Sequence, residues 1–199
     1  AELDVSYGAL KAENLYGNSE VEVSFGKGYF ERFEKGEVTI KYSDVEIASA
    51  DVLDMDTQFS KVELDEVNNL ELEAKYGAVE LGDVGSLDAD ASFNGLNIER
   101  LKGSLRLEAS YVSDFEIEEV LSSFQLIDIK GKFSSYEINL ASDVSADLDA
   151  TFEFSDLKDS GANIEYTYKV RDSNENEYKG KINGGNSSKR ILIDSSYGN

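Results

Sequence analysis

The chain has 199 residues, which is long enough for one domain with a sizeable hydrophobic core. It carries 41 Asp and Glu against 19 Lys and Arg, and its formal net charge of −22 repels nucleic acids and anionic lipids. It contains no His, Cys, Pro or Trp. These absences exclude disulfides, thiol nucleophiles, Ser–His relays and zinc sites built from imidazole or thiolate.

Apolar residues alternate with polar ones along most of the chain, beginning with Val21-Glu22-Val23 and continuing in Leu70-Glu71-Leu72-Glu73-Ala74. A period of two places all apolar side chains on one face of a strand. No apolar run approaches the length of about 18 residues that a membrane-spanning helix needs. The sequence therefore predicts an all-β protein without a transmembrane segment.

Residues 1–121 contain an internal repeat with a length of about 17 residues. Its clearest mark is an aromatic residue at spacings of 17 or 18, and the members are Tyr7, Phe25, Tyr42, Phe59, Tyr76, Phe93 and Tyr111. Such a short unit cannot bury its own apolar face, so stacked coils of a β-solenoid are predicted, with equivalent residues about 4.8 Å apart. The aromatic column becomes a ladder of stacked rings. A small residue follows most of the rings, and we expect it to hold the positive φ of a corner.

The repeat is less regular in the remaining chain. Residues 122–155 form irregular coils, with rings expected at Phe133 and Phe152. Residues 156–190 are predicted to be an insertion that contains a projecting β-hairpin. Residues 191–199 repeat the pattern once more around Tyr197 and are predicted to be the last coil. The prediction is thus one domain over 1–199, with roughly ten coils.

The aromatic turns carry a family resemblance. Ser6-Tyr7-Gly8, Tyr76-Gly77-Ala78-Val79-Glu80-Leu81 and the closing stretch from Ile191 to Gly198 resemble bacterial adhesin β-helix proteins of the Bacteroidetes type, related to an auto-transporter adhesin head. This resemblance implies a right-handed parallel β-helix wound from a single chain. It also implies export to the periplasm or outer cell surface, with the signal or anchor outside this sequence.

We expect a non-catalytic, adhesin-like module that presents an acidic solenoid face to a glycan or protein partner, without a cofactor. A polysaccharide-acting enzyme is one alternative, because β-helices host such enzymes and two carboxylates suffice for glycoside hydrolysis. With 41 acidic residues, however, a suitable pair is expected by number alone. A purely structural spacer is the other alternative, since a solenoid is a rigid rod.

Aromatic faces often bind carbohydrate, which makes Tyr29 and the hairpin residues Tyr166, Tyr168 and Tyr178 binding candidates. The competing interpretation is that the hairpin tyrosines pair across strands or cover the open end of the solenoid.

Several outward columns are acidic. The first contains Glu46, Glu63 and Glu80. The other two contain Asp54, Glu71 and Asp88, and Asp56, Glu73 and Asp90. Stacked like charges destabilise a sheet, and Ca²⁺ prefers carboxylate oxygen ligands, so the first column is a candidate calcium ladder. The alternative is a solvated acidic face, partly balanced by the interleaved Lys41, Lys61 and Lys75, that keeps the protein soluble.

Overall fold

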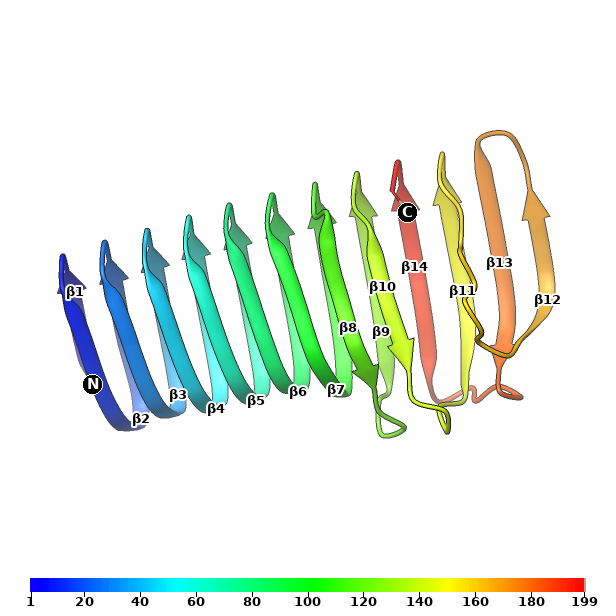
Figure 1. The fold of residues 1–199 in the computed structure, drawn as a ribbon. Coiled ribbons are helices and arrows are strands. Elements are labelled where there is room, and N and C mark those ends of the chain that lie inside the picture. The colour runs from blue at the N-terminus through cyan, green and yellow to red at the C-terminus, as the bar shows by residue number, and fades with distance from the viewer. Residues whose placement is uncertain (199) are drawn as a thin grey trace.

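The repeat folds as one turn of a flattened β-solenoid, as shown by a computed structural model that describes residues 1–198 (Figure 1). In a regular coil the chain descends in a front sheet, bends, and returns in a back sheet to a tight turn. About eight such coils are stacked, fewer than the ten expected. Residues 1–198 include no helix, and so none of membrane-spanning length.

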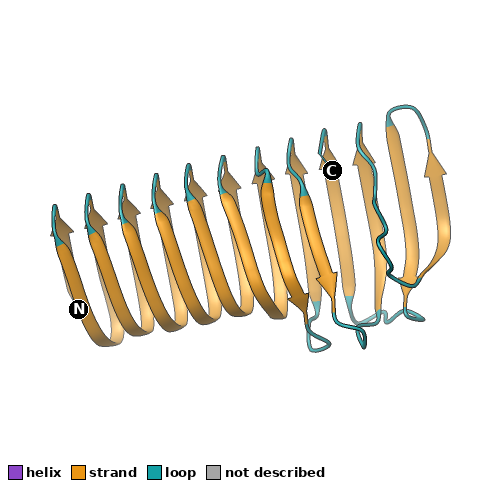
Figure 2. Cartoon of the chain, viewed as in Figure 1, coloured by secondary structure: helices purple, strands orange, loops and turns teal. Residues whose placement is uncertain are grey.

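The structure has 14 strands, many of them bent so that one strand contributes to both sheets (Figure 2). Their bounds are β1 (Glu2–Ser6), β2 (Ala9–Ser24), β3 (Lys27–Lys41), β4 (Asp44–Gln58), β5 (Lys61–Lys75), β6 (Ala78–Ser92), β7 (Gly95–Ser110), β8 (Asp114–Val120), β9 (Leu126–Lys132), β10 (Tyr136–Leu140), β11 (Ala146–Glu153), β12 (Ile164–Arg171), β13 (Glu175–Ile182) and β14 (Arg190–Ser196).

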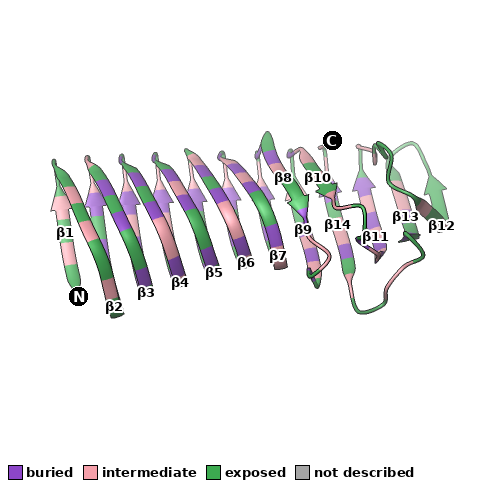
Figure 3. Cartoon of the chain, turned by 60° about the horizontal axis from the view of Figure 1, so that its bottom comes forward, coloured by how far each residue is buried: buried purple, intermediate pink, exposed green. Residues whose placement is uncertain are grey.

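Neighbouring coils pair in parallel with an offset of one repeat, so that Val62 lies beside Val79 and Leu64 beside Leu81. Alternation then places one set of side chains between the sheets and the other in solvent, which gives the buried and exposed bands of Figure 3. The inward columns are fully buried, with Leu64, Leu81 and Ile98 at 1%, 2% and 0% exposure. Burial of these columns is the main source of stability.

The predicted ring ladder is present. It contains ten rings with neighbouring centroids 4.7–5.1 Å apart: the seven named above, the expected Phe133 and Tyr197, and Phe154. The ladder lies on the outer surface of the turns. Nine of its rings are between 46% and 52% exposed, whereas Tyr7, at the open end, is 80% exposed.

The expected position of the positive φ was wrong by one residue. The aromatic residue itself adopts the left-handed conformation in every turn, with φ between 51° and 57°. Two interactions offset this strain: ring stacking, and a main-chain hydrogen bond such as Phe59 N–H to the Lys75 carbonyl at 3.0 Å. The small residue that follows allows close approach instead, since a Cβ on Gly77 would lie 2.2 Å from the Ser60 carbonyl oxygen.

The C-terminal third differs from the expected layout. Phe152 points into the core, and Phe154 is the ladder ring, so the expected register was wrong by two residues. The hairpin formed by β12 and β13 is confirmed, but it does not project, because β13 pairs antiparallel with β11 and extends the back sheet. Strand β14 lies between β9 and β11 and pairs in parallel with both. The last coil in sequence is therefore not the last in the stack.

Replacement of Phe59 tests the balance between stacking and backbone strain. We expect Phe59→Ala to lower the free energy of unfolding by about 1–3 kcal/mol, because two stacked contacts are lost. Phe59→Val is expected to be less stable than Phe59→Ala, although Val is larger, because a β-branched side chain is strained at positive φ. Urea unfolding measures the free energy of unfolding of both variants, and Phe59→Tyr is the control that should leave it unchanged. A valine variant more stable than the alanine variant would contradict this account.

Removal of β14 tests its position in the back sheet. Because β11 contacts the rest of the stack through β14, deletion of residues 187–199 should detach β11 and β13 as well. Hydrogen exchange is expected to show lost protection over residues 146–182 and retained protection over residues 20–100. Leu192→Ser, on the outer face of the same strand, is the control that keeps protection in both regions. Retained protection in β11 after the deletion would show that β14 is dispensable.

Candidate functional site: an acidic face on the back sheet

The outer surface of the back sheet carries an unbroken column of six carboxylates. The parallel register aligns one residue from each of β1 to β6, and the members are Glu2, Glu20, Glu37, Asp54, Glu71 and Asp88. Strand spacing places neighbouring members about 4.8 Å apart at the backbone. The column exists because the repeat places an acidic residue at the same position before each of these aromatic turns, as Glu71 precedes Tyr76.

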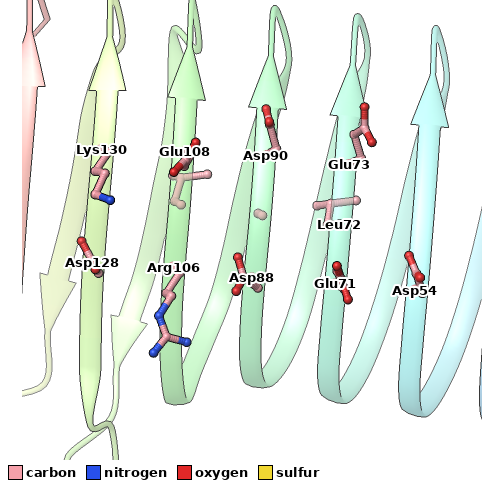
Figure 4. A pocket seen from close by; sticks show the side chains of 12 residues that line it. Asp54, Glu71, Leu72, Glu73, Asp88, Asp90, Arg106, Glu108, Asp128 and Lys130 are labelled. Atoms are coloured by element: carbon pink, nitrogen blue, oxygen red, sulfur yellow. The ribbon is translucent and has the colours of Figure 1, made fainter.

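A second acidic column runs beside the first, two residues further along each strand. Its consecutive members are Asp56, Glu73, Asp90 and Glu108. The rows are separated by about 6.6 Å of extended backbone. Between them lies a hollow of about 420 Å³, and Figure 4 shows the carboxylates on both sides of it. At its far end each row contains one cation: Arg106 lies beside Asp88, with Asp128 beyond it, and Lys130 lies beside Glu108.

Few cations balance this surface. Among residues 1–198, none of the six carboxylates in the first column has a lysine or arginine nitrogen within 4.0 Å. In the second column, Lys75 contacts Glu73. Like charges side by side on a sheet repel one another, and salt weakens the repulsion at an exposed surface. The face therefore has a strong, regular negative potential. We call these two columns the acidic face.

The candidate calcium ladder has a different environment. Glu46, Glu63 and Glu80 do share one column on the front sheet. However, Lys61 lies between two of them, with its Nζ 2.7 Å from Glu63 and 3.2 Å from Glu80. Hydrogen bonds to Glu63 and Glu80 raise the pKa of Lys61, which keeps this counter-charge in place. Among the described residues, no group of three acidic side chains has the geometry to hold a metal ion.

The four candidate tyrosines do not form one site. Tyr29 lies on β3, far from the hairpin, with Lys11 Nζ 5.0 Å from its ring centroid. Tyr166 and Tyr178 face each other across the hairpin at 5.9 Å, and Tyr178 is buried. Tyr168 is exposed and lies beside an irregularity in the strand pairing. The hairpin pair thus covers the end of the core, as the competing interpretation held.

Tyr178 is the centre of a polar cluster on the inner side of the hairpin. Its hydroxyl donates to Asp156 and accepts a hydrogen bond from Arg171 Nε at 2.8 Å. Lys169 Nζ lies 4.6 Å from the Tyr166 ring centroid. Burial, followed by the effect of the Asp156 carboxylate, raises the pKa of Tyr178. These contacts join the hairpin to the segment before it, which is a structural role.

The ring ladder is a poor surface for sugar stacking, although it is long and exposed. A sugar ring packs on the face of an aromatic ring, and each inner ring of the ladder has both faces covered by its neighbours. Only ring edges are open along its length. An open ring face remains at Tyr7, which explains its greater exposure.

The sequence interpretation missed an ion-pair cluster beside the bend of the coils. Arg100 contacts Asp83, and Lys102 Nζ lies 2.7 Å from the same carboxylate. A hydrogen bond from Lys102, with a smaller one from Arg100, lowers the pKa of Asp83 against the opposing effect of burial. The signal was available, because Asp83 and Arg100 are one repeat apart in the sequence and therefore occupy the same position in neighbouring coils.

The charge is also distributed unevenly along the stack. Residues 156–199 contain seven acidic and seven basic side chains, so the whole net charge of −22 lies in residues 1–155. The acidic excess thus lies in the coils before the hairpin segment, whereas the hairpin, its flanking segments and β14 together are formally neutral.

The fold places this chain in the class of β-solenoid repeat proteins. A scan against protein-family models, a search of curated proteins and a search of solved structures each gave no match.

Addition of calcium tests whether the front column of Glu46, Glu63 and Glu80 binds the ion. Because Lys61 already balances Glu63 and Glu80, we expect millimolar Ca²⁺ to shift the melting temperature no more than NaCl at equal ionic strength. Lys61→Met serves as the comparison, since it removes the counter-charge and leaves the carboxylates. Differential scanning calorimetry gives the measurement. If Ca²⁺ raised the melting temperature of the wild-type protein more than NaCl did, the hypothesis of a calcium ladder would be supported instead.

Proposed function

We propose that this protein is a non-catalytic, adhesin-like binding module that presents the acidic face to a partner bearing repeated positive charges. The partner is a basic protein surface or an amino-sugar glycan. The exported location, at a cell surface or in the periplasm, is part of the proposal and rests on the resemblance of the aromatic turns to adhesin β-helix proteins.

The observation that supports this function is the column of six carboxylates without an ion pair among residues 1–198. A surface whose only task is solubility needs charges of either sign in any arrangement. Here the carboxylates stand in rows on a stiff sheet, and little entropy is lost when such a surface meets a partner. Regular spacing also favours partners whose cations repeat on a similar scale.

The position of the acidic face supports binding in preference to catalysis. Its carboxylates lie on the outside of a sheet, above a hollow that opens to solvent (Figure 4). Hydrolysis of a glycosidic bond needs a carboxylic acid and a carboxylate on opposite sides of the bond, usually in a cleft that surrounds the sugar. A flat, repeated surface instead suits an extended contact with many weak ion pairs.

A pair of charge-neutral variants tests the proposal. The back-face triple variant carries Glu37→Gln, Asp54→Asn and Glu71→Gln. We expect it to bind polylysine or a chitosan oligomer about tenfold more weakly, a change of ~1.4 kcal/mol, because it breaks the uncompensated column. Isothermal titration at low salt gives the affinity, and comparison of the two probes separates a peptide partner from a glycan.

The control is the front-face triple variant with Glu46→Gln, Glu63→Gln and Glu80→Gln. It removes the same formal charge from a column that Lys61 already balances. Binding should stay close to that of the wild type. Equal losses in both variants would indicate general charge attraction, and no binding by either probe would favour a structural spacer.

A further inference from the structure

The two sheets differ in length at the C-terminal end. The front sheet ends at β10, which pairs only with β8 among residues 1–198. The back sheet continues beyond this level through β14, β11, β13 and β12. Residues 156–163 cross the front of these strands without forming a strand, to the right of β10 in Figure 2. Part of the back sheet thus lacks the front strand that covers it elsewhere.

Side chains around this gap are more exposed than their equivalents in the regular coils. Ile138 on β10 is half-buried, whereas Ile117 and Ile98 in the same column are fully buried. On the back sheet, Ile193 is half-buried between the fully buried Ile129 and Ala150. These residues point inward and lack the packing partners that a front strand supplies in the other coils.

A cavity of about 840 Å³ occupies this gap. Its apolar lining comes from β10, the back strands and the crossing segment, and includes Ile138, Leu140, Leu148, Leu157, Ile164 and Ile193. The volume lies within the range of about 300–1,000 Å³ that binding pockets occupy. Behind the gap, β14 is in view between β10 and the crossing segment in Figure 1.

The positions of the aromatic turns show that the gap corresponds to the position of one front strand. In a regular coil the front strand starts two residues after the ring, as Ala78 follows Tyr76. The turn at Phe133 leads into β10, and the turn at Phe154 leads into the crossing segment. Tyr197 stacks between these two rings, at 5.0 and 4.8 Å. The front position that belongs to Tyr197 therefore lies between β10 and residues 156–163, where the cavity is.

We propose that this cavity is a strand-acceptor site for an extended peptide segment of a partner polypeptide. The peptide lies parallel to β10, pairs with its unpaired edge, and inserts aliphatic side chains at alternate positions against Ile138 and Ile193. A polypeptide fits better than an acyl chain, because an edge strand offers main-chain donors and acceptors that only a peptide satisfies along its length.

The test uses a synthetic peptide with the sequence of residues 95–101, a front strand that fills the equivalent position in its own coil. We expect this peptide to raise the melting temperature of the full chain by about 3 °C or more at saturation. A peptide of the same composition, with Leu and Ile moved to consecutive positions, should give no shift. Hydrogen exchange should show new protection in β10 of the wild-type protein, which does not depend on any variant.

Two variants locate the effect. Ile138→Asp places a charge in the cavity and should abolish the shift, whereas Val52→Asp, at an exposed position on a distant coil, should leave it intact. If Ile138→Asp does not fold, the hydrogen-exchange protection of β10 in the wild-type protein with the peptide is the deciding measurement. Equal binding of the rearranged peptide would overturn the proposal. So would binding of laurate without binding of the peptide, or stabilisation only when the strand is fused after residue 199.

Discussion

Parallel pairing at a fixed offset of one repeat is the interaction on which the rest of this structure depends. It places each side chain directly beside the same repeat position of the next coil, so that each repeat position forms a column. Apolar positions form a continuous core, as in the column of Leu64 and Leu81. Aromatic positions form a ladder of ten rings, and acidic positions form a charged face. Surface and core are thus products of the same register.

The same register has a cost, because it brings like charges together wherever the repeat is acidic. On the front sheet Lys61 relieves the repulsion between Glu63 and Glu80, and beside the bend Arg100 and Lys102 do the same for Asp83. On the back sheet the six-membered column has no such partner within the described residues. A stability-driven arrangement would place cations there too, as it does elsewhere in this molecule. This exception supports the proposal that the acidic face binds a partner.

The C-terminal third shows how the back sheet of this solenoid ends. An antiparallel hairpin extends the back sheet, and Tyr166 and Tyr178 cover the last apolar residues. Strand β14 enters between β9 and β11, and its ring joins the ladder between Phe133 and Phe154. The front sheet is not extended in the same way. Its final strand, β10, pairs only with β8 among residues 1–198, and its other edge lies beside an apolar cavity.

Sequence alone determined the all-β class, the coil length, the inward columns and nine of the ten ladder rings, because all of these follow from local periodicity. It also aligned Glu46, Glu63 and Glu80 and named Lys61 among the lysines that balance the acidic columns. It did not show that Tyr178 is buried, because burial of the hairpin depends on its packing in three dimensions. Nor did it put the positive φ on the rings. Only the tertiary structure decided the place of β14 and the cavity beside β10, since strand order across a long gap in sequence is set by packing and not by local pattern.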